Sequence, residues 1–132
     1  MSEHTTAEFY EGGVVTITLA PVPTSADLEK NFMGALNALL DAGKRFSVIV
    51  DSSRVVAADL ILTKMVMSWL RGNRVRFKKH LRCSSIIVEG TIIRNILDIV
   101  FKVQTPVAPM KLVSSMDAAW EFVTLIEHQR HD

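Results

Sequence analysis

The pair His80 and Cys83 is the first candidate for chemistry, because a thiol and a base lie three residues apart. A catalytic thiol needs that base to be held in place by a third group. Cys83 begins a predicted strand, CSSIIVEG, where it is expected to be a small buried side chain. No C-x-x-C or H-x-x-x-H spacing offers metal ligands, and no run of glycines offers a phosphate cradle. We therefore expect no catalytic residue, no metal and no cofactor.

The second candidate is the stretch VIVDSSRVVAAD, residues 48–59. Asp51 ends a predicted strand, which is where α/β folds place active groups, but it has no partner base nearby. Ser52 and Ser53 carry hydroxyls that a kinase could modify, although a polar turn at the strand end is the favoured interpretation. Asp59 is expected to cap the following helix, because its carboxylate can accept hydrogen bonds from the first helical N–H groups.

A third candidate is a basic segment with no acidic residue inside it. It contributes six of the chain's 15 lysines and arginines: Arg71, Arg74, Arg76, Lys78, Lys79 and Arg82. The segment is interpreted either as a binding surface for an anionic partner or as a solvated helix end that suits the helix dipole. Nucleic acid is not expected, because the net charge is only +1 and Phe77 is the only aromatic residue in the segment.

Two predicted helices, 59–70 and 91–103, are apolar around most of their circumference. The residues expected to form an apolar interface or pocket are Leu62, Met65, Val66, Trp69, Ile93, Ile96, Leu97, Val100 and Phe101. Apolar surface left in water costs roughly 25 cal/mol per Å². Three outcomes remain open: a subunit interface, the walls of a pocket for a lipid or small apolar ligand, or tight packing within one core.

The predicted elements alternate after an opening hairpin. Two strands, 7–10 and 14–19, flank Gly12 and Gly13, and a helix then runs from the capping pair Thr24 and Asp27 to a left-handed stop at Gly43. FSVIVD is predicted as a central strand, and the order continues as helix, strand, helix, strand, helix. This order predicts a single α/β domain over residues 1–132, with a mixed sheet, four helices and an ordered core at about 7–127.

Composition sets broad limits on the class of protein. The chain is 48% hydrophobic and 22% charged, which is typical of a globular domain. A single cysteine, no secretory signal and no apolar run of about 20 residues lead us to expect a cytoplasmic protein without a transmembrane segment.

The motifs resemble one known family. VIVDSSRVVAAD is similar to the strand and turn of STAS domains, the SpoIIAA-like fold of anti-sigma factor antagonists, and KLVSSMDAAWEFV is similar to their last strand and helix. The element order agrees over about residues 7–127. Where the family has D-S-S-G, this chain has Asp59 followed by Leu60, Ile61 and Leu62, so the phosphoacceptor position is apolar and the glycine is missing.

The resemblance implies a non-enzymatic regulatory module that contacts a protein partner. Together with the apolar helices, it leads us to expect a homodimer. One alternative is a carrier or sensor of a small hydrophobic ligand or lipid. The other is a regulator similar to anti-sigma factor antagonists that works without phosphorylation.

Overall fold

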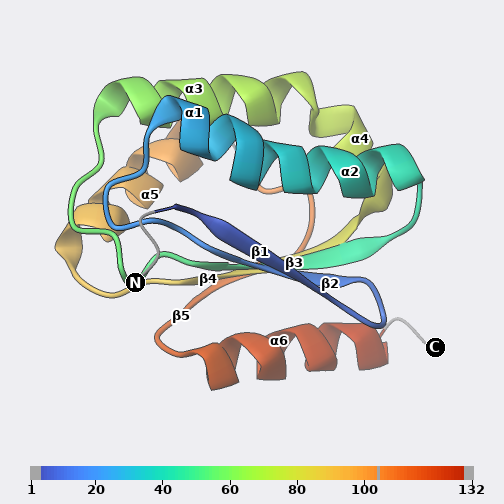
Figure 1. Ribbon diagram of the computed structural model, residues 1–132. Coiled ribbons are helices and arrows are strands. Elements are labelled where there is room, and N and C mark those ends of the chain that lie inside the picture. The colour runs from blue at the N-terminus through green and yellow to red at the C-terminus, as the bar shows by residue number, and fades with distance from the viewer. Residues whose placement is uncertain (1–3, 104, 130–132) are drawn as a thin grey trace.

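The computed structural model describes residues 4–103 and 105–129 (Figure 1). Its sheet begins with the expected hairpin, in which β1 (Thr6–Tyr10) pairs antiparallel with β2 (Val14–Thr18). Gly12 and Gly13 form the turn with φ angles of 85° and 80°, a region that glycine enters without steric cost.

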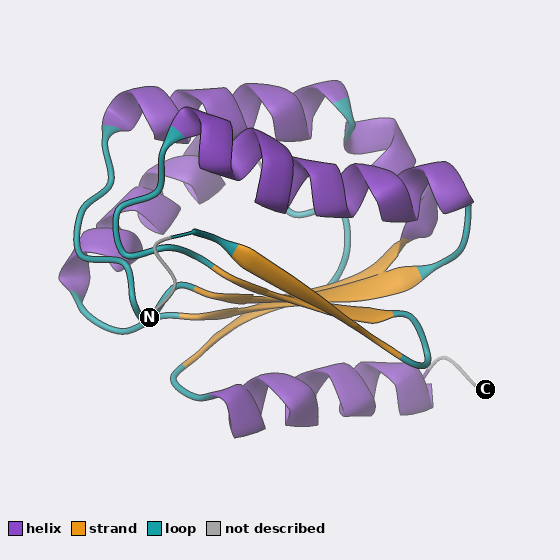
Figure 2. Cartoon of the chain, in the orientation of Figure 1, coloured by secondary structure: helices purple, strands orange, loops and turns teal. Residues whose placement is uncertain are grey.

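The other strands add in chain order, so the sheet reads β1-β2-β3-β4-β5. These are β3 (Phe46–Asp51), β4 (Leu81–Ile87) and β5 (Met110–Val113). From β2 onward all neighbouring strands are parallel. Because each crossover steps in the same direction and is right-handed, the connecting helices are all expected on one face of the sheet. Figures 1 and 2 show this arrangement: α1 to α5 cover one face, and α6 (Met116–Gln129) lies alone against the other.

The first connecting helix is continuous but changes its winding. It consists of α1 (Ser25–Asp27), a π-helical segment η1 (Leu28–Met33) and α2 (Gly34–Ala42). The predicted ends are confirmed, since Thr24 accepts a hydrogen bond from the Asp27 N–H at 3.1 Å and Gly43 has a φ of 73°. The Asp27 carboxylate turns away from the cap and binds the backbone N–H and hydroxyl of Thr5 instead, at 2.8 and 2.6 Å.

The structure has one helix more than the four that the sequence predicts. α3 (Leu60–Gly72) and α5 (Thr91–Val103) lie where they are expected. No helix was predicted for residues 74–80 of the basic segment between them, but these residues form α4 (Arg74–His80). The described residues thus form an α/β fold with five helices, counting α1, η1 and α2 as one.

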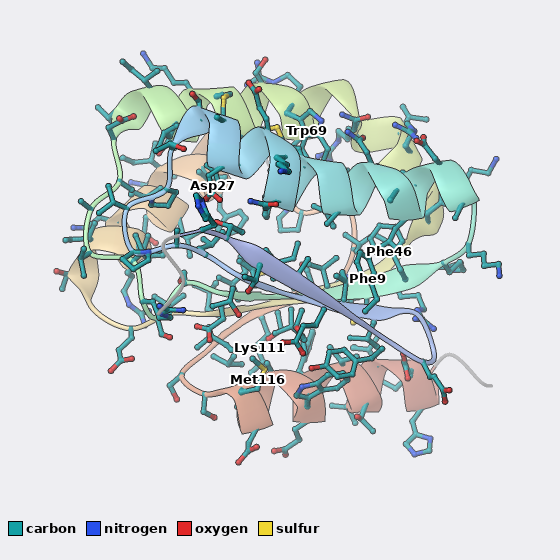
Figure 3. The ribbon with its side chains drawn as sticks, in the orientation of Figure 1. Phe9, Asp27, Phe46, Trp69, Lys111 and Met116 are labelled. Atoms are coloured by element: carbon teal, nitrogen blue, oxygen red, sulfur yellow. The ribbon has the colours of Figure 1, made fainter. Side chains whose placement is uncertain are left out.

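Alternation along the strands separates two cores. In β3, Val48 and Phe46 point toward the helical layer, whereas Ile49 points toward α6. Both faces of β2 are covered, since Val14 to Ile17 are all buried: Val15 and Ile17 pack in the core of the helical layer, and Val14 packs in the core beneath α6. Figure 3 shows the two layers through Trp69, in the helical layer, and Met116, in the α6 layer.

Candidate functional site

An apolar cavity of about 300 Å³ lies between the sheet and the helical layer. Its floor includes Val48 and Val50 of β3 and Ile86 of β4, and its walls come from η1, α2, α3, α4, α5 and the segment before β5. The volume is at the lower end of the range for ligand pockets, about 300–1,000 Å³.

The cavity brings together most of the apolar residues that the sequence singled out. Seven of those nine residues line it: Leu62, Val66, Ile93, Ile96, Leu97, Val100 and Phe101. Met65 and Trp69 do not. Trp69 instead makes edge contacts with Phe32 and Phe77, at ring-centroid distances of 6.2 and 5.6 Å.

Helix α3 explains why a cavity forms here. None of its residues is buried, although eight of its thirteen side chains are apolar. Its inward side chains, such as Leu62 and Val66, reach the cavity wall and not a filled core. A molecule that fills the cavity would remove the apolar surface of these walls from water, which is worth roughly 25 cal/mol per Å².

Sequence reasoning missed the other walls of the cavity. Leu28, Phe32 and Leu36 lie at the helical spacing of 4 and 4 residues on the first helix, a pattern that indicates a buried helix face but not a ligand site. All four residues of segment 105–108 also line the cavity, and the sequence of this segment gives no signal for such a role.

The polar groups of the cavity are few, and two of them are already bonded to backbone. Ser52 is 2% exposed, and its hydroxyl donates to the Ile87 carbonyl at 2.5 Å. The Thr63 hydroxyl donates to the Asp59 carbonyl at 3.1 Å. Arg74 is the one charged side chain among the described residues that line the cavity. Its Nη1 donates to the carbonyl oxygen of Thr105 at 2.8 Å.

The structure disperses the basic segment. Arg76 forms an ion pair with Asp41 at 2.6 Å, on the outside of the helical layer. Arg82 donates to the Gly12 and Gly13 carbonyls at 2.6 and 2.8 Å, and its Nη2 lies 3.4 Å from the Glu127 carboxylate. Arg71, Lys78 and Lys79 are exposed. The six cations therefore do not form a single surface.

The loop that the resemblance would make a phosphorylation switch, with Asp51, Ser52, Ser53 and Asp59, is held by its own hydrogen bonds. Asp51 accepts from the backbone N–H and the hydroxyl of Ser53, at 2.9 and 2.6 Å. Ser52 is buried, as described above. The prediction for Asp59 is confirmed, because its carboxylate accepts from the Leu62 N–H at 2.7 Å and caps α3. Cys83 is fully buried, as the sequence predicts, with its Sγ 3.4 Å from the Ser47 hydroxyl.

A second apolar feature lies outside the cavity, where α3 begins. Val56, Leu60 and Ile61 are 64%, 62% and 78% exposed. The loop before α3 is tied to the loop after β2, since the Val56 N–H donates to the Pro21 carbonyl at 2.8 Å. We call Val56, Leu60 and Ile61 the α3 patch.

Among the described residues, no group of histidine, cysteine or carboxylate side chains is arranged to hold a metal ion. Over the same part of the chain, no helix combines the length and apolarity that a membrane span requires. Comparisons with family models, curated proteins and solved structures give no significant match. The resemblance to STAS domains therefore rests on the sequence motifs alone.

Proposed function

We propose that this domain binds a small hydrophobic molecule in the cavity and acts as its carrier or sensor. The single observation that carries the proposal is an apolar cavity of about 300 Å³ whose walls come from five helical elements of one layer. A cavity of roughly 150 Å³ lined by aliphatic and aromatic side chains stays dry and binds benzene. Twice that volume accommodates on the order of a dozen carbon atoms.

Native mass spectrometry of the freshly purified protein tests the proposal directly. We expect an added mass that disappears after denaturation and solvent extraction. Thermal unfolding of the extracted protein should shift upward with decanol, because a ligand that binds only the folded state at about 100 times its Kd adds roughly 2.7 kcal/mol. A protein without added mass whose unfolding decanol leaves unchanged would refute the proposal.

A second candidate function is self-association through the α3 patch, which the exposure of Val56, Leu60 and Ile61 favours. Exposed apolar side chains gathered at one end of a helix are a common mark of a protein interface. Light scattering should then give the mass of two chains, and Ile61→Lys should give that of one. Val75→Lys is the matched control, because Val75 is 82% exposed in α4, outside the patch. A monomeric wild-type protein excludes this candidate and leaves the first intact.

If the domain regulates a partner in the manner of STAS domains, we propose that it does so without phosphorylation. Ser52 is buried and bonded to Ile87, and the Ser53 hydroxyl is bonded to Asp51. A kinase needs an accessible hydroxyl, so the buried Ser52 is a poor acceptor and the half-buried Ser53 would first have to release Asp51. Phosphate found on Ser52 or Ser53 by mass spectrometry of protein from its native cell would contradict this view.

A further inference from the structure

We propose that the ligand of the cavity is a single-chain amphiphile of about ten to twelve carbons whose anionic head group binds Arg74. This inference rests on the proposed function, and it adds the chemical class of the ligand and the residue that selects it.

Arg74 is placed at one boundary of the cavity. It is the first residue of α4, directly after the break at Asn73 that separates α4 from α3. Arg74 is half-buried as a residue, and its guanidinium donates to the carbonyl of the exposed Thr105 at 2.8 Å, so it links α4 to the segment leading to β5. Both Arg74 and Thr105 line the cavity. The charge therefore lies where the helical layer meets that segment.

Arg74 differs from two other arginines of the basic segment because it has no carboxylate partner among the described residues. Arg76 and Arg82 each form an ion pair with a carboxylate. No described carboxylate lies within 4.0 Å of Arg74, and its bond to Thr105 uses only one of the five N–H donors of a guanidinium. A guanidinium with unused donors at the cavity matches the planar oxygen pair of a carboxylate, or the oxygens of a phosphate monoester.

The uncharged residues of the lining indicate that the rest of the ligand is apolar. Apart from Arg74, the described lining residues are uncharged, and the hydroxyls of Ser52 and Thr63 already donate to backbone carbonyls. Ser84 and Thr105 add two more hydroxyls to a lining that is otherwise apolar. The cavity thus offers one cation at its boundary and a mostly apolar interior. A molecule with one anionic end and one unbranched apolar chain satisfies both features, whereas a neutral hydrocarbon leaves the Arg74 donors unused.

Displacement of a fluorescent apolar probe tests this inference with three ligands of equal chain length: decanoic acid, decanol and decyl phosphate. In the wild-type protein, decanoate should bind about tenfold or more tightly than decanol, as expected for a hydrogen-bonded charge pair. Arg74→Met should remove that difference while leaving decanol affinity within about twofold. Arg71→Met is the matched control, since Arg71 is exposed and does not line the cavity. Decyl phosphate shows whether the site prefers carboxylate or phosphate oxygens.

The outcomes separate this inference from the proposed function. If decanol and decanoate bind equally and Arg74→Met changes neither, the cavity binds apolar ligands but Arg74 selects nothing, and the inference is wrong. If no ligand displaces the probe, the proposed function fails as well. Should Arg74→Met not fold, the wild-type pH profile decides. Decanoate affinity should fall toward that of decanol as the pH drops below the pKa of the free fatty acid, roughly 5, because protonation removes the charge that pairs with Arg74, and a flat profile overturns the inference.

Discussion

Replacing Val66 with leucine should stabilise the ligand-free protein, because it adds one methylene group to the wall of the cavity. A buried methylene group contributes about 0.8 kcal/mol. Leucine also has a better helix propensity than valine, worth a few tenths of a kcal/mol. Val75→Leu is the matched control, since Val75 is also helical but 82% exposed, and it gains the propensity alone.

Urea unfolding of the two variants separates the contributions. With a slope of about 2 kcal/mol per molar urea, the midpoint of Val66→Leu should lie roughly 0.4 M above that of Val75→Leu. The slope itself should not change, because the folded and unfolded surfaces are nearly the same. If the two variants differ by less than about 0.3 kcal/mol, which is the usual error of additivity, the space beside Val66 is not available and the reasoning about the cavity is wrong.

Filling the cavity with larger side chains should also weaken ligand binding. Val66→Leu combined with Val100→Leu occupies part of the space a ligand would fill, from α3 and from α5. We expect this double variant to bind decanol more weakly than the wild type while being more stable without ligand. Opposite signs for stability and affinity cannot come from a general stabilisation of the fold, which would leave the affinity unchanged or raise it.

Four further variants test three local features of the structure. Burial would raise the pKa of Asp27, but hydrogen bonds from Thr5 and Asn31 outweigh this effect and hold the pKa below its usual value. The stability that Asp27 contributes is therefore complete above the usual pKa, and it is lost as the pH falls through the lowered pKa. Asp27→Asn should cost about 2 kcal/mol at pH 7, and urea titrations from pH 6 to pH 2 should show a smaller loss of stability than in the wild type. Gly13→Ala should lower the free energy of unfolding by about 2–3 kcal/mol in thermal unfolding, since the new Cβ would lie 2.8 Å from Arg82 Nη2. Gly12→Ala is the control: there is open space around Gly12, so this change should cost only about 1 kcal/mol for the positive φ. Asp59→Ala removes the cap of α3 and should cost about 1 kcal/mol, measured by the urea midpoint; no loss would mean that solvent replaces the cap fully.

Much of the fold could be predicted because its signals are local. Gly43 ends a helix through its own φ angle, and Asp59 begins one through a bond to a residue three positions away. The strand FSVIVD is recognisable from its β-branched residues. α4 was missed because its apolar residues, Val75 and Phe77, lie two apart and point differently: Phe77 is buried and Val75 is exposed.

The site could be predicted only in part, for a geometric reason. The sequence identifies α3 and α5 as more apolar than a small core requires, and it leaves an interface, a pocket and tight packing as alternatives. Choosing between them depends on how closely the helices approach the sheet, which no local pattern encodes. Arg74 was predicted as one of six equivalent cations. Its position at the cavity follows from Thr105, a residue 31 positions later in the chain.

Because the parallel strands all add in one direction, the sheet has a closely packed core on the α6 face and the cavity on the opposite, helical face. The backbone hydrogen bonds that pair the described strands lie within the sheet, and α6 closes a core of its own with Ile49, Cys83 and Val123. Movement of α3, which has no buried residue, would open the cavity without breaking a strand pairing or disturbing the core beneath α6. Entry and release of a ligand would then require local opening of the helical layer alone. Amide hydrogens in α3 should exchange with solvent well before those of β3 and α6.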